Sequence, residues 1–390
     1  MSNKFKSIAE HYNIKGKTAL VRIGCDVPMQ GKKIVDDSRL REILPTIRFL
    51  EKHGAYIILV GHLGRPGGKV VSSLSLKPIG YHLGKLLRQP VKVIPINYGY
   101  KKIISEAKSG VVLLENIRFE VGEDSNDNNL AKNLARLADF FVNEAFSVSH
   151  RESASLCGVA KYLPSFAGLT LYHEITTLKK FMSPRRKIKS VAIIGGAKVA
   201  DKLPVIKSLL KKVDYVLTGG AVANTLLKAK GREVGVSLID KDDLSIARVL
   251  VRGSARVLVL PKDVVVSKGA RGLIKFATKL SVRDKIIDLG PLTTALYLKY
   301  LKTARIIFWA GSLGITEHKV GSQSTLAIGK FLSKMSHGST QVLVGGGDTG
   351  SFLINQGLKV THISTAGGAL LEFLAGHKLP ALMALGYYER

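Results

Sequence analysis

The residues best suited to chemistry in the second half of the chain are glycines that follow short apolar runs. They form four clusters: Gly195–Gly196, Gly219–Gly220, Gly311 with Gly314, and Gly345–Gly346–Gly347. Glycine lets backbone amides approach a phosphate closely, and a helix N-terminus adds about half a unit of positive charge to hold an anion. A single glycine pair is usually a tight turn, but four at strand ends predict a nucleotide site. No GxxxxGK[ST] P-loop occurs.

Charged residues stand beside these glycines. Lys198 and Lys202 are four apart in GGAKVADK, on what we expect to be the first turns of a helix, so both ammonium groups would share a face and reach a phosphate. Asp348 follows three glycines at an expected helix start, where an aspartate can be an N-cap or can hold Mg²⁺ beside bound phosphates. Glu317 is a candidate acceptor for ribose hydroxyls, although an isolated glutamate is normally a surface residue.

In the first half of the chain, the residues that follow the predicted strands are mainly arginines instead of glycines. One histidine and five arginines follow predicted strands or lie in their loops: Arg22, Arg39, His62, Arg65, Arg118 and Arg151. One arginine is a surface charge, but this set at one sheet edge would form an anion-binding site with bidentate geometry for carboxylate and phosphate. Opposite a nucleotide site, it predicts phosphoryl transfer, which needs positioning and charge neutralisation rather than a nucleophilic side chain. No Ser/His/Asp or Cys/His constellation competes.

Short apolar runs that alternate with helical patterns must position these residues. In the first half the expected strands lie within 18–24, 55–61, 111–116 and 139–146. In the second half they lie within 190–196, 214–220, 256–264, 285–290, 305–311, 340–347 and 360–365. Continuous apolar runs are typical of parallel strands covered by helices on both faces, so we expect two parallel sheets. The helical segment that Ser183–Pro184 should end, within 169–189, is the predicted boundary.

Composition bounds the class of protein. The chain has 390 residues, enough for two or three domains, and its 46% hydrophobic and 23% charged residues are globular values. No apolar run could span a bilayer and no secretory signal is visible, so we expect a cytoplasmic protein without membrane contact. Two cysteines exclude a disulfide framework. The net charge of +30 attracts either nucleic acid or a small phosphorylated substrate. Since the basic runs are typical of solvated helix faces, nucleic acid is the less favoured partner.

Taken together, these motifs resemble the phosphoglycerate kinase family from Arg22 to Pro380. The motifs in the family's order are GHLGRP, SLKP, ENIRF, NEAF, GGAKVADK, GGAVANT, GGGDT and the HIST to LP tail. The resemblance implies an α/β protein of two Rossmann-like lobes joined by a hinge helix. Residues 1–168 would bind phosphoglycerate, 169–189 would link the lobes, 190–377 would bind nucleotide, and the tail of about 378–390 would pack back on the first lobe.

The resemblance also implies site roles. The acid substrate and its phosphate would be held by Arg22, Asp26, Arg39, His62, Arg65, Arg118 and Arg151. The transferring phosphoryl group would be met by Arg39, Lys198 and Gly347. Nucleotide would be held by Gly196, Lys198, Lys202, Gly219, Gly220, Glu317, Gly345, Gly346, Gly347, Asp348 and Thr349, and Asp348 would also hold Mg²⁺. The implied reaction interconverts 1,3-bisphosphoglycerate and ADP with 3-phosphoglycerate and ATP in glycolysis, and the expected state is a monomer.

This chain departs from the family pattern at the acid site and the phosphate site. Gly24 replaces a substrate-binding aspartate, Asp26 replaces an asparagine, and Ala310 replaces a phosphate-facing asparagine. Ala366 replaces the first glycine of the tail motif. Two alternatives to an active kinase therefore stay open. One is a catalytically weakened relative with an altered acid substrate or a nucleotide- or partner-binding role, and the other is a basic nucleic-acid-associated protein with the kinase fold.

Overall fold

The computed structural model describes residues 5–11, 13–182, 188–254, 256–268 and 271–388. Two compact units are present: residues 1–176 with 378–390, and residues 177–377. The first boundary falls within helix α6 (Leu169–Met182). The helix end expected at Ser183–Pro184 lies outside the described residues. Among the described helices, none has the length and apolar character that crossing a membrane requires.

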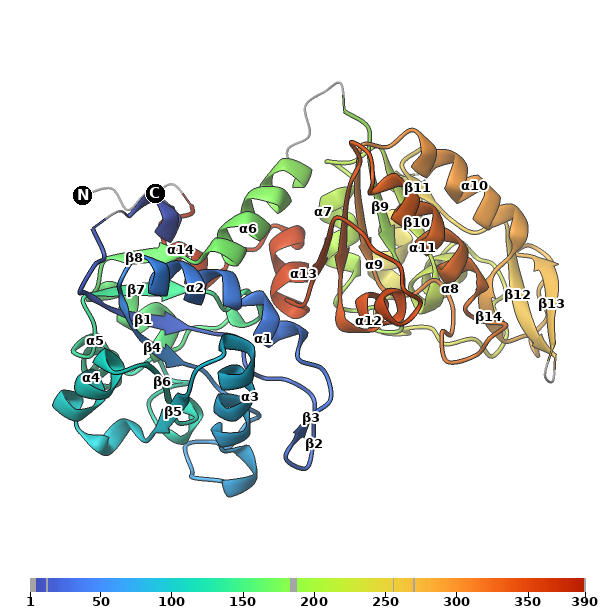
Figure 1. Cartoon of the computed structure of the whole chain (residues 1–390). Helices are drawn as coiled ribbons and strands as arrows, with labels where there is room; N and C mark the ends of the chain where they lie inside the picture. The colour runs from blue at the N-terminus through green and yellow to red at the C-terminus, as the bar shows by residue number, and fades with distance from the viewer. Residues whose placement is uncertain (1–4, 12, 183–187, 255, 269–270, 389–390) are drawn as a thin grey trace. The chain divides into compact units, whose positions relative to one another are not determined.

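The N-terminal unit contains a six-stranded, all-parallel sheet in the order β5-β6-β4-β1-β7-β8 (Figure 1). Its strands are β1 (Thr18–Arg22), β4 (Tyr56–Val60), β5 (Val91–Ile94), β6 (Val111–Leu114), β7 (Phe140–Asn143) and β8 (Ser165–Ala167). A small hairpin pairs β2 (Met29–Gln30) with β3 (Lys33–Ile34). The helices are α1 (Ser38–Glu42), α2 (Leu44–Lys52), α3 (Lys77–Leu87), α4 (Tyr100–Lys108), α5 (Asn128–Ala135) and the C-terminal α14 (Pro380–Ala384).

Strand residues of this sheet alternate between two cores. Ala19 and Val21 of β1 pack in the core that contains the apolar face of α2 and α3, whereas Leu20 packs in the core that contains α4 and α5. Successive side chains of a strand point to opposite faces, so a strand covered on both sides must be apolar throughout. This is why the strands read as unbroken apolar runs. The C-terminal tail belongs to this unit, where the Ala381 N–H donates to the Ser149 carbonyl at 3.1 Å.

The C-terminal unit has a second six-stranded parallel sheet, in the order β11-β10-β9-β15-β16-β17 (Figure 1). Its strands are β9 (Ser190–Ile194), β10 (Tyr215–Thr218), β11 (Leu258–Val259), β15 (Ile306–Ala310), β16 (Gln341–Gly345) and β17 (His362–Ser364). The helices are α7 (Leu203–Leu209), α8 (Gly220–Ala229), α9 (Leu244–Gly253), α10 (Pro291–Lys302), α11 (Gln323–Met335), α12 (Gly347–Asn355) and α13 (Gly368–Ala375). Trp309 is buried with α10, α11 and α12 on one face.

The expectation of two parallel sheets is confirmed, but the strand assignments within 256–290 need correction. The segment 256–264 forms β11 and the start of β12 (Asp263–Lys268), not one strand. Together with β13 (Arg271–Phe276) and β14 (Ile286–Leu289), β12 builds a separate antiparallel sheet in the order β13-β12-β14. Pro261 explains the break, because proline has no N–H to give to a sheet ladder.

Candidate active site

The cations of the N-terminal unit gather at the carboxyl edge of its sheet. Arg22 ends β1, His62 follows β4, Arg118 follows β6 and Arg151 follows β7, and these four strands are neighbours in the order β6-β4-β1-β7. Parallel strands end at the same edge, so residues far apart in sequence meet there. Arg39 comes from α1 and Arg65 from the loop after β4.

His62 lies at the centre of this group and is 2% exposed. Burial holds the pKa of His62 well below its usual range. Neighbouring positive charges lower it further, from Arg22, Arg118, Arg151 and Arg39. The imidazole is therefore neutral at physiological pH, and it can offer one N–H to a ligand without adding a charge.

Arg22 is the largest charged side chain among the fully buried ones, and it is 2% exposed. Its Nε donates to Ser155 Oγ at 2.9 Å, one terminal nitrogen donates to the Ile23 carbonyl, and the other lies 2.9 Å from His62 Nδ1. All three guanidinium nitrogens are thus engaged inside the protein. The structure brings Arg22 to the predicted edge, but behind His62.

Three further arginines lie at this edge of the sheet and differ in solvent exposure: Arg118 is buried, Arg151 is half-buried and Arg65 is exposed. Arg118 is buried and donates to the Gly64 carbonyl at 2.8 Å, and its Nε contacts Asp124 Oδ1 at 3.2 Å. Burial and the nearby charges of Arg118 and Arg65 lower the pKa of Arg151, which shows that these cations repel one another. Arg65 is exposed. Such a cluster of repelling cations is stabilised by binding an anion.

The two departures at this edge lie side by side in the loop after β1. Asp26 Oδ1 accepts from the Gly64 N–H at 3.0 Å, Asp26 Oδ2 lies 4.0 Å from His62 Nε2, and the Asp26 carbonyl accepts from Arg39. The Asp26 side chain is 45% exposed, so its carboxylate also faces solvent. At Gly24, a Cβ would meet only Ser147 Oγ, at 3.4 Å, so the space accepts a Cβ.

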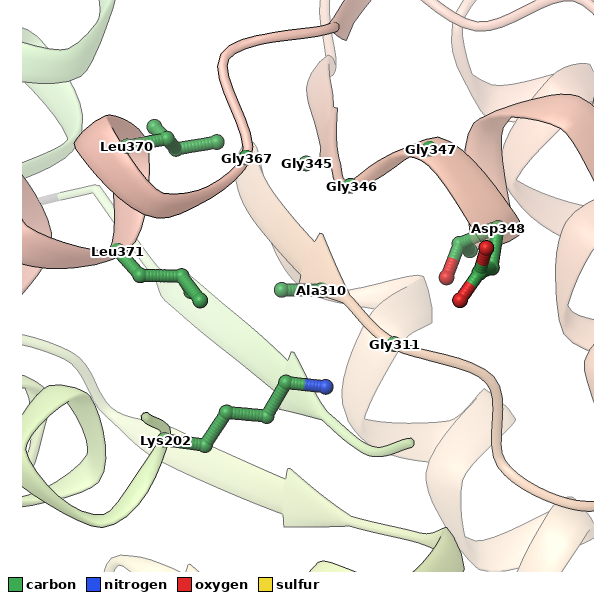
Figure 2. A pocket seen from close by; sticks show the side chains of 11 residues that line it. Lys202, Ala310, Gly311, Gly345, Gly346, Gly347, Asp348, Gly367, Leu370 and Leu371 are labelled. Atoms are coloured by element: carbon green, nitrogen blue, oxygen red, sulfur yellow. The ribbon is translucent and has the colours of Figure 1, made fainter. Parts of the chain in front are cut away.

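The C-terminal unit contains a cavity of about 530 Å³ at the carboxyl edge of its sheet. Of the predicted nucleotide residues, it is lined by Gly196, Lys198, Lys202, Gly220, Glu317, Gly346 and Asp348. A smaller cavity of about 90 Å³ adjoins the same loops and is lined by Lys202, Ala310, Gly311, Gly345–Thr349, Gly367, Leu370 and Leu371 (Figure 2). Gly219 lines neither cavity and serves as the N-cap of α8.

Glycine is required where two loops of this edge cross. Gly311 has φ +88°, and a Cβ there would overlap the Gly195 carbonyl oxygen and Lys202 Nζ. Gly346, the N-cap of α12, has φ +105°. Both backbones adopt conformations that side chains rarely allow. The α12 N-terminus consequently presents its free N–H groups beside the smaller cavity, where an anion binds favourably.

Figure 2 shows Lys202 extending beneath Ala310 and Gly311, with the Asp348 carboxylate on the other side of the cavity. Lys202 Nζ donates to the Gly195 carbonyl, and burial lowers the pKa of Lys202 to about 8. The charges of Asp201 and Asp348 oppose this shift, and Lys198 adds to it. Thr349 Oγ1 is buried beside them and has no hydrogen-bond partner in the part of the chain that the structure describes. The cavity thus contains an unpaired hydroxyl and an ammonium group whose charge is disfavoured by burial. Binding of an anion would satisfy both groups.

One expectation about these side chains is wrong in detail, and one of the two roles left open for Asp348 is excluded. Lys198 and Lys202 do not lie within a helix, because α7 starts at Leu203 with Pro204 in its first turn, where proline is favoured. Asp348 is not an N-cap, since Gly346 takes that position and Asp348 follows in the first turn. Both lysines and Asp348 nevertheless line one cavity.

Asp348 fits the role of a carboxylate for Mg²⁺ that arrives with a nucleotide. Mg²⁺ prefers one or two carboxylates together with substrate phosphate oxygens over an all-protein cage. Among the described residues no group of three or more histidine, cysteine, aspartate or glutamate side chains could hold a metal ion. A single carboxylate next to a helix N-terminus suits a metal that is part of the substrate.

Sequence reasoning missed the apolar wall of the larger cavity. It is formed by Leu238, Ile286, Ile287, Leu313, Ile315 and Leu371. These residues come from four separate segments, and isolated apolar residues carry no signal of a shared pocket. A wall of this kind suits the flat faces of a nucleotide base.

Comparisons with known proteins decide the family. A sequence model described as phosphoglycerate kinase matches residues 9–377. The chain belongs to the phosphoglycerate kinase family. A phosphoglycerate kinase of Dictyoglomus turgidum is 42% identical over 386 residues, which cover 96% of each chain. Among solved structures, phosphoglycerate kinase from Coxiella burnetii matches with TM-score 0.87 at 35% identity, and that from Pyrococcus horikoshii with TM-score 0.83 at 30% identity, each over 98% of both chains.

Ala310, one of the positions where the chain departs from the family pattern, lies at the smaller cavity. Ala310 ends β15, is 2% exposed and lines the smaller cavity opposite Gly345 and Gly346. The strand continues in register with β16 up to the Ala310 and Gly345 pair, so the fold at this point is intact. Alanine at this position gives the cavity no polar side chain from the end of β15.

Proposed function

We propose that this chain catalyses reversible transfer of the acyl phosphate of 1,3-bisphosphoglycerate to ADP, which gives 3-phosphoglycerate and ATP in glycolysis. One observation carries the proposal: each of two parallel sheets has, at its carboxyl edge, a group of residues suited to an anionic ligand. The edge around His62 supplies cations, and the edge around Lys202 supplies a glycine-lined cavity with helix amides. The family relationship supports the same reaction.

In the N-terminal unit, the acid substrate would be held by its two anionic ends. Arg65 is exposed and Arg151 is half-buried, so each can bind a phosphate or carboxylate in bidentate fashion. His62 and Arg118 are buried near Arg151 and would restrict the orientation of the bound acid. Arg39, on α1, is half-buried and would neutralise charge on the acyl phosphate.

In the C-terminal unit, the nucleotide would lie with its base against the apolar wall and its phosphates at α12. Glu317 would accept from ribose hydroxyls, while Lys202 and the amides of Gly346–Thr349 would bind phosphate oxygens. Lys198 and the Gly347 amide would meet the phosphoryl group as it moves. Mg²⁺ bound to the nucleotide and held by Asp348 would neutralise further phosphate charge.

The test is the steady-state rate of ATP formation from 1,3-bisphosphoglycerate and ADP. The wild-type protein should turn over, and Lys198→Ala should lower kcat by about 10²–10³-fold with a smaller change in nucleotide KM, because a charge that meets the moving group acts mainly in the transition state. Lys211→Ala, at an exposed lysine of the same unit, is the matched control. Absence of turnover together with normal ADP binding would favour the weakened relative instead.

Cytoplasmic location and a monomeric state stay predictions of this proposal. Sedimentation equilibrium over a range of protein concentrations would test the second, and a mass above 42.2 kDa would contradict it.

A further inference from the structure

A buried hydrogen-bonded chain leads from Glu123 to His62. Glu123 Oε1 accepts from Ser155 Oγ at 2.6 Å, Ser155 Oγ accepts from Arg22 Nε at 2.9 Å, and a terminal nitrogen of Arg22 lies 2.9 Å from His62 Nδ1. The Ser155 N–H also donates to Glu123 Oε2 at 3.0 Å. Each of the four residues is at most 2% exposed. A buried carboxylate therefore compensates a buried guanidinium through one serine.

The direction of the last bond follows from the chemistry of arginine. A guanidinium has only N–H donors and stays protonated in proteins. The partner nitrogen must therefore accept, so His62 Nδ1 carries a lone pair. Since burial and the surrounding arginines hold the pKa of His62 well below its usual range, the ring is neutral, and its single hydrogen must lie on Nε2.

We propose that Arg22 is a positioning residue that fixes His62 in the tautomer with hydrogen on Nε2, so that the imidazole offers the acid substrate a donor and never a lone pair. This inference deepens the proposed function and rests on it for the identity of the substrate. It places Arg22 behind the site instead of in contact with the substrate.

The surroundings of Nε2 show why the tautomer matters. Asp26 Oδ2 lies 4.0 Å from Nε2, which is beyond hydrogen-bond distance, and the Asp26 side chain is partly exposed. An oxygen of a bound carboxylate or phosphate can accept from Nε2–H at this side. In the opposite tautomer, the Nε2 lone pair would face that oxygen, and both the attraction and the geometry would be lost.

The direct test is nuclear magnetic resonance of protein labelled with ¹⁵N in its histidine rings, with the His62 signals assigned by comparison with His62→Gln. Nδ1 should show the shift of an unprotonated nitrogen and Nε2 that of a protonated one, unchanged across neutral pH. Hydrogen on Nδ1, or averaged shifts that report a mixture, would overturn the proposal without any measurement of turnover.

Substitution then tests whether Arg22 is the cause. Arg22→Met keeps the length of the side chain but has no donor, so it should give mixed His62 tautomers and raise the phosphoglycerate KM about tenfold with nucleotide KM unchanged. Arg22→Lys retains a donor and should recover part of both. Arg48→Met, at an exposed arginine of α2, is the control and should change neither.

Ser155→Ala provides a second route if Arg22→Met does not fold. Without the Ser155 hydroxyl the guanidinium loses its anchor to Glu123, so a second His62 tautomer should appear and the phosphoglycerate KM should rise. A pure Nε2–H tautomer in a folded Arg22→Met or in Ser155→Ala, with unchanged KM, would show that Arg22 is only structural. Because the spectrum is read without substrate, loss of the proposed kinase activity would be recognised separately.

Discussion

Lys202, the buried lysine proposed to bind nucleotide phosphate, would couple nucleotide binding to pH. Burial lowers the pKa of Lys202 to about 8, so above that pH the free protein loses the ammonium that a phosphate would contact. The dissociation constant of ADP should therefore rise between about pH 7 and about pH 9, by at most about tenfold per pH unit beyond the pKa.

Calorimetric titration of wild type and Lys202→Arg would isolate this effect, because ionisation of ADP itself is common to both proteins. Arginine stays charged throughout, so the variant should show the smaller pH dependence. Equal pH dependence in the two proteins would show that Lys202 does not contact the phosphates.

Asp26 is the departure with the clearest expected direction. Its carboxylate lies among the cations that would bind the acid substrate, so it should repel that substrate. Asparagine keeps an Oδ1 that can accept from the Gly64 N–H and removes the charge. Asp26→Asn should therefore lower the phosphoglycerate KM severalfold and leave the nucleotide KM unchanged. A raised phosphoglycerate KM in a normally folded variant would show that the carboxylate helps to organise the site.

Residue types at strand ends predicted that these side chains share one sheet edge, but not which of them are covered. The pattern could place Arg22 and His62 at one edge, since Arg22 ends one strand of the sheet and His62 follows another. It could not show that Arg22 is covered, because Ser155 and Glu123 approach it from segments more than 100 residues away. Burial of a charge depends on partners that no local pattern reveals.

At the scale of elements, the N-terminus of α6 depends on Glu144. Its carboxylate accepts from the N–H groups of Thr170 at 3.0 Å and Leu171 at 2.9 Å, and from the Thr46 hydroxyl. Burial raises the pKa of Glu144 to about 7 from its ordinary 4.5, because a charged carboxylate there has lost its water. Since α6 contains the boundary between the units, this carboxyl group links proton binding to the boundary helix.

A raised pKa in the folded protein makes the stabilisation by Glu144 complete below about pH 4.5, with loss as the pH rises through about 7. Between these limits, wild type should lose up to about 3 kcal/mol of unfolding free energy relative to Glu144→Gln. Urea denaturation of both proteins at several pH values would measure this. Glu152→Gln, at an exposed glutamate of the same unit, should show the same pH dependence of unfolding free energy as wild type. If Glu144→Gln also showed the wild-type pH dependence, Glu144 would not be the group that titrates.

Strand prediction succeeded for strands that form continuous apolar runs, and it missed β5, β8 and β13, which do not. β1, β9 and β15 are almost wholly buried and appear as unbroken apolar runs. β5 has an exposed lysine in a run of four residues, and β12 and β13 form an antiparallel pair with partly exposed faces, so neither gives the same signal. In the antiparallel sheet, β14 was predicted as a strand within 285–290, but its antiparallel pairing was not.

For the whole molecule, the net charge of +30 has two interpretations: it attracts small anionic substrates, or it binds nucleic acid. The salt dependence of catalysis and of nucleic-acid binding distinguishes the two. Attraction of small anionic substrates should make kcat/KM fall as salt rises from about 0.01 to about 1 M, over which the Debye length shrinks from about 30 to about 3 Å. The value of kcat should change less, because it describes substrate already bound.

Titration with duplex DNA and with RNA under the same salts tests the other interpretation. Only weak binding that disappears near physiological salt is expected, as for any basic surface. Tight binding at that salt, together with a flat kcat/KM, would assign the charge to a nucleic-acid partner.

The central claim is direct transfer of a phosphoryl group between two ligands bound to one chain. A single-turnover experiment tests it, with excess enzyme, ADP and 1,3-bisphosphoglycerate labelled with ³²P in the acyl phosphate, quenched over time. The label should appear in the terminal phosphate of ATP in step with formation of 3-phosphoglycerate, and Lys198→Ala should slow this step. Release of the label as inorganic phosphate, or intact 1,3-bisphosphoglycerate with both ligands bound, would contradict the account.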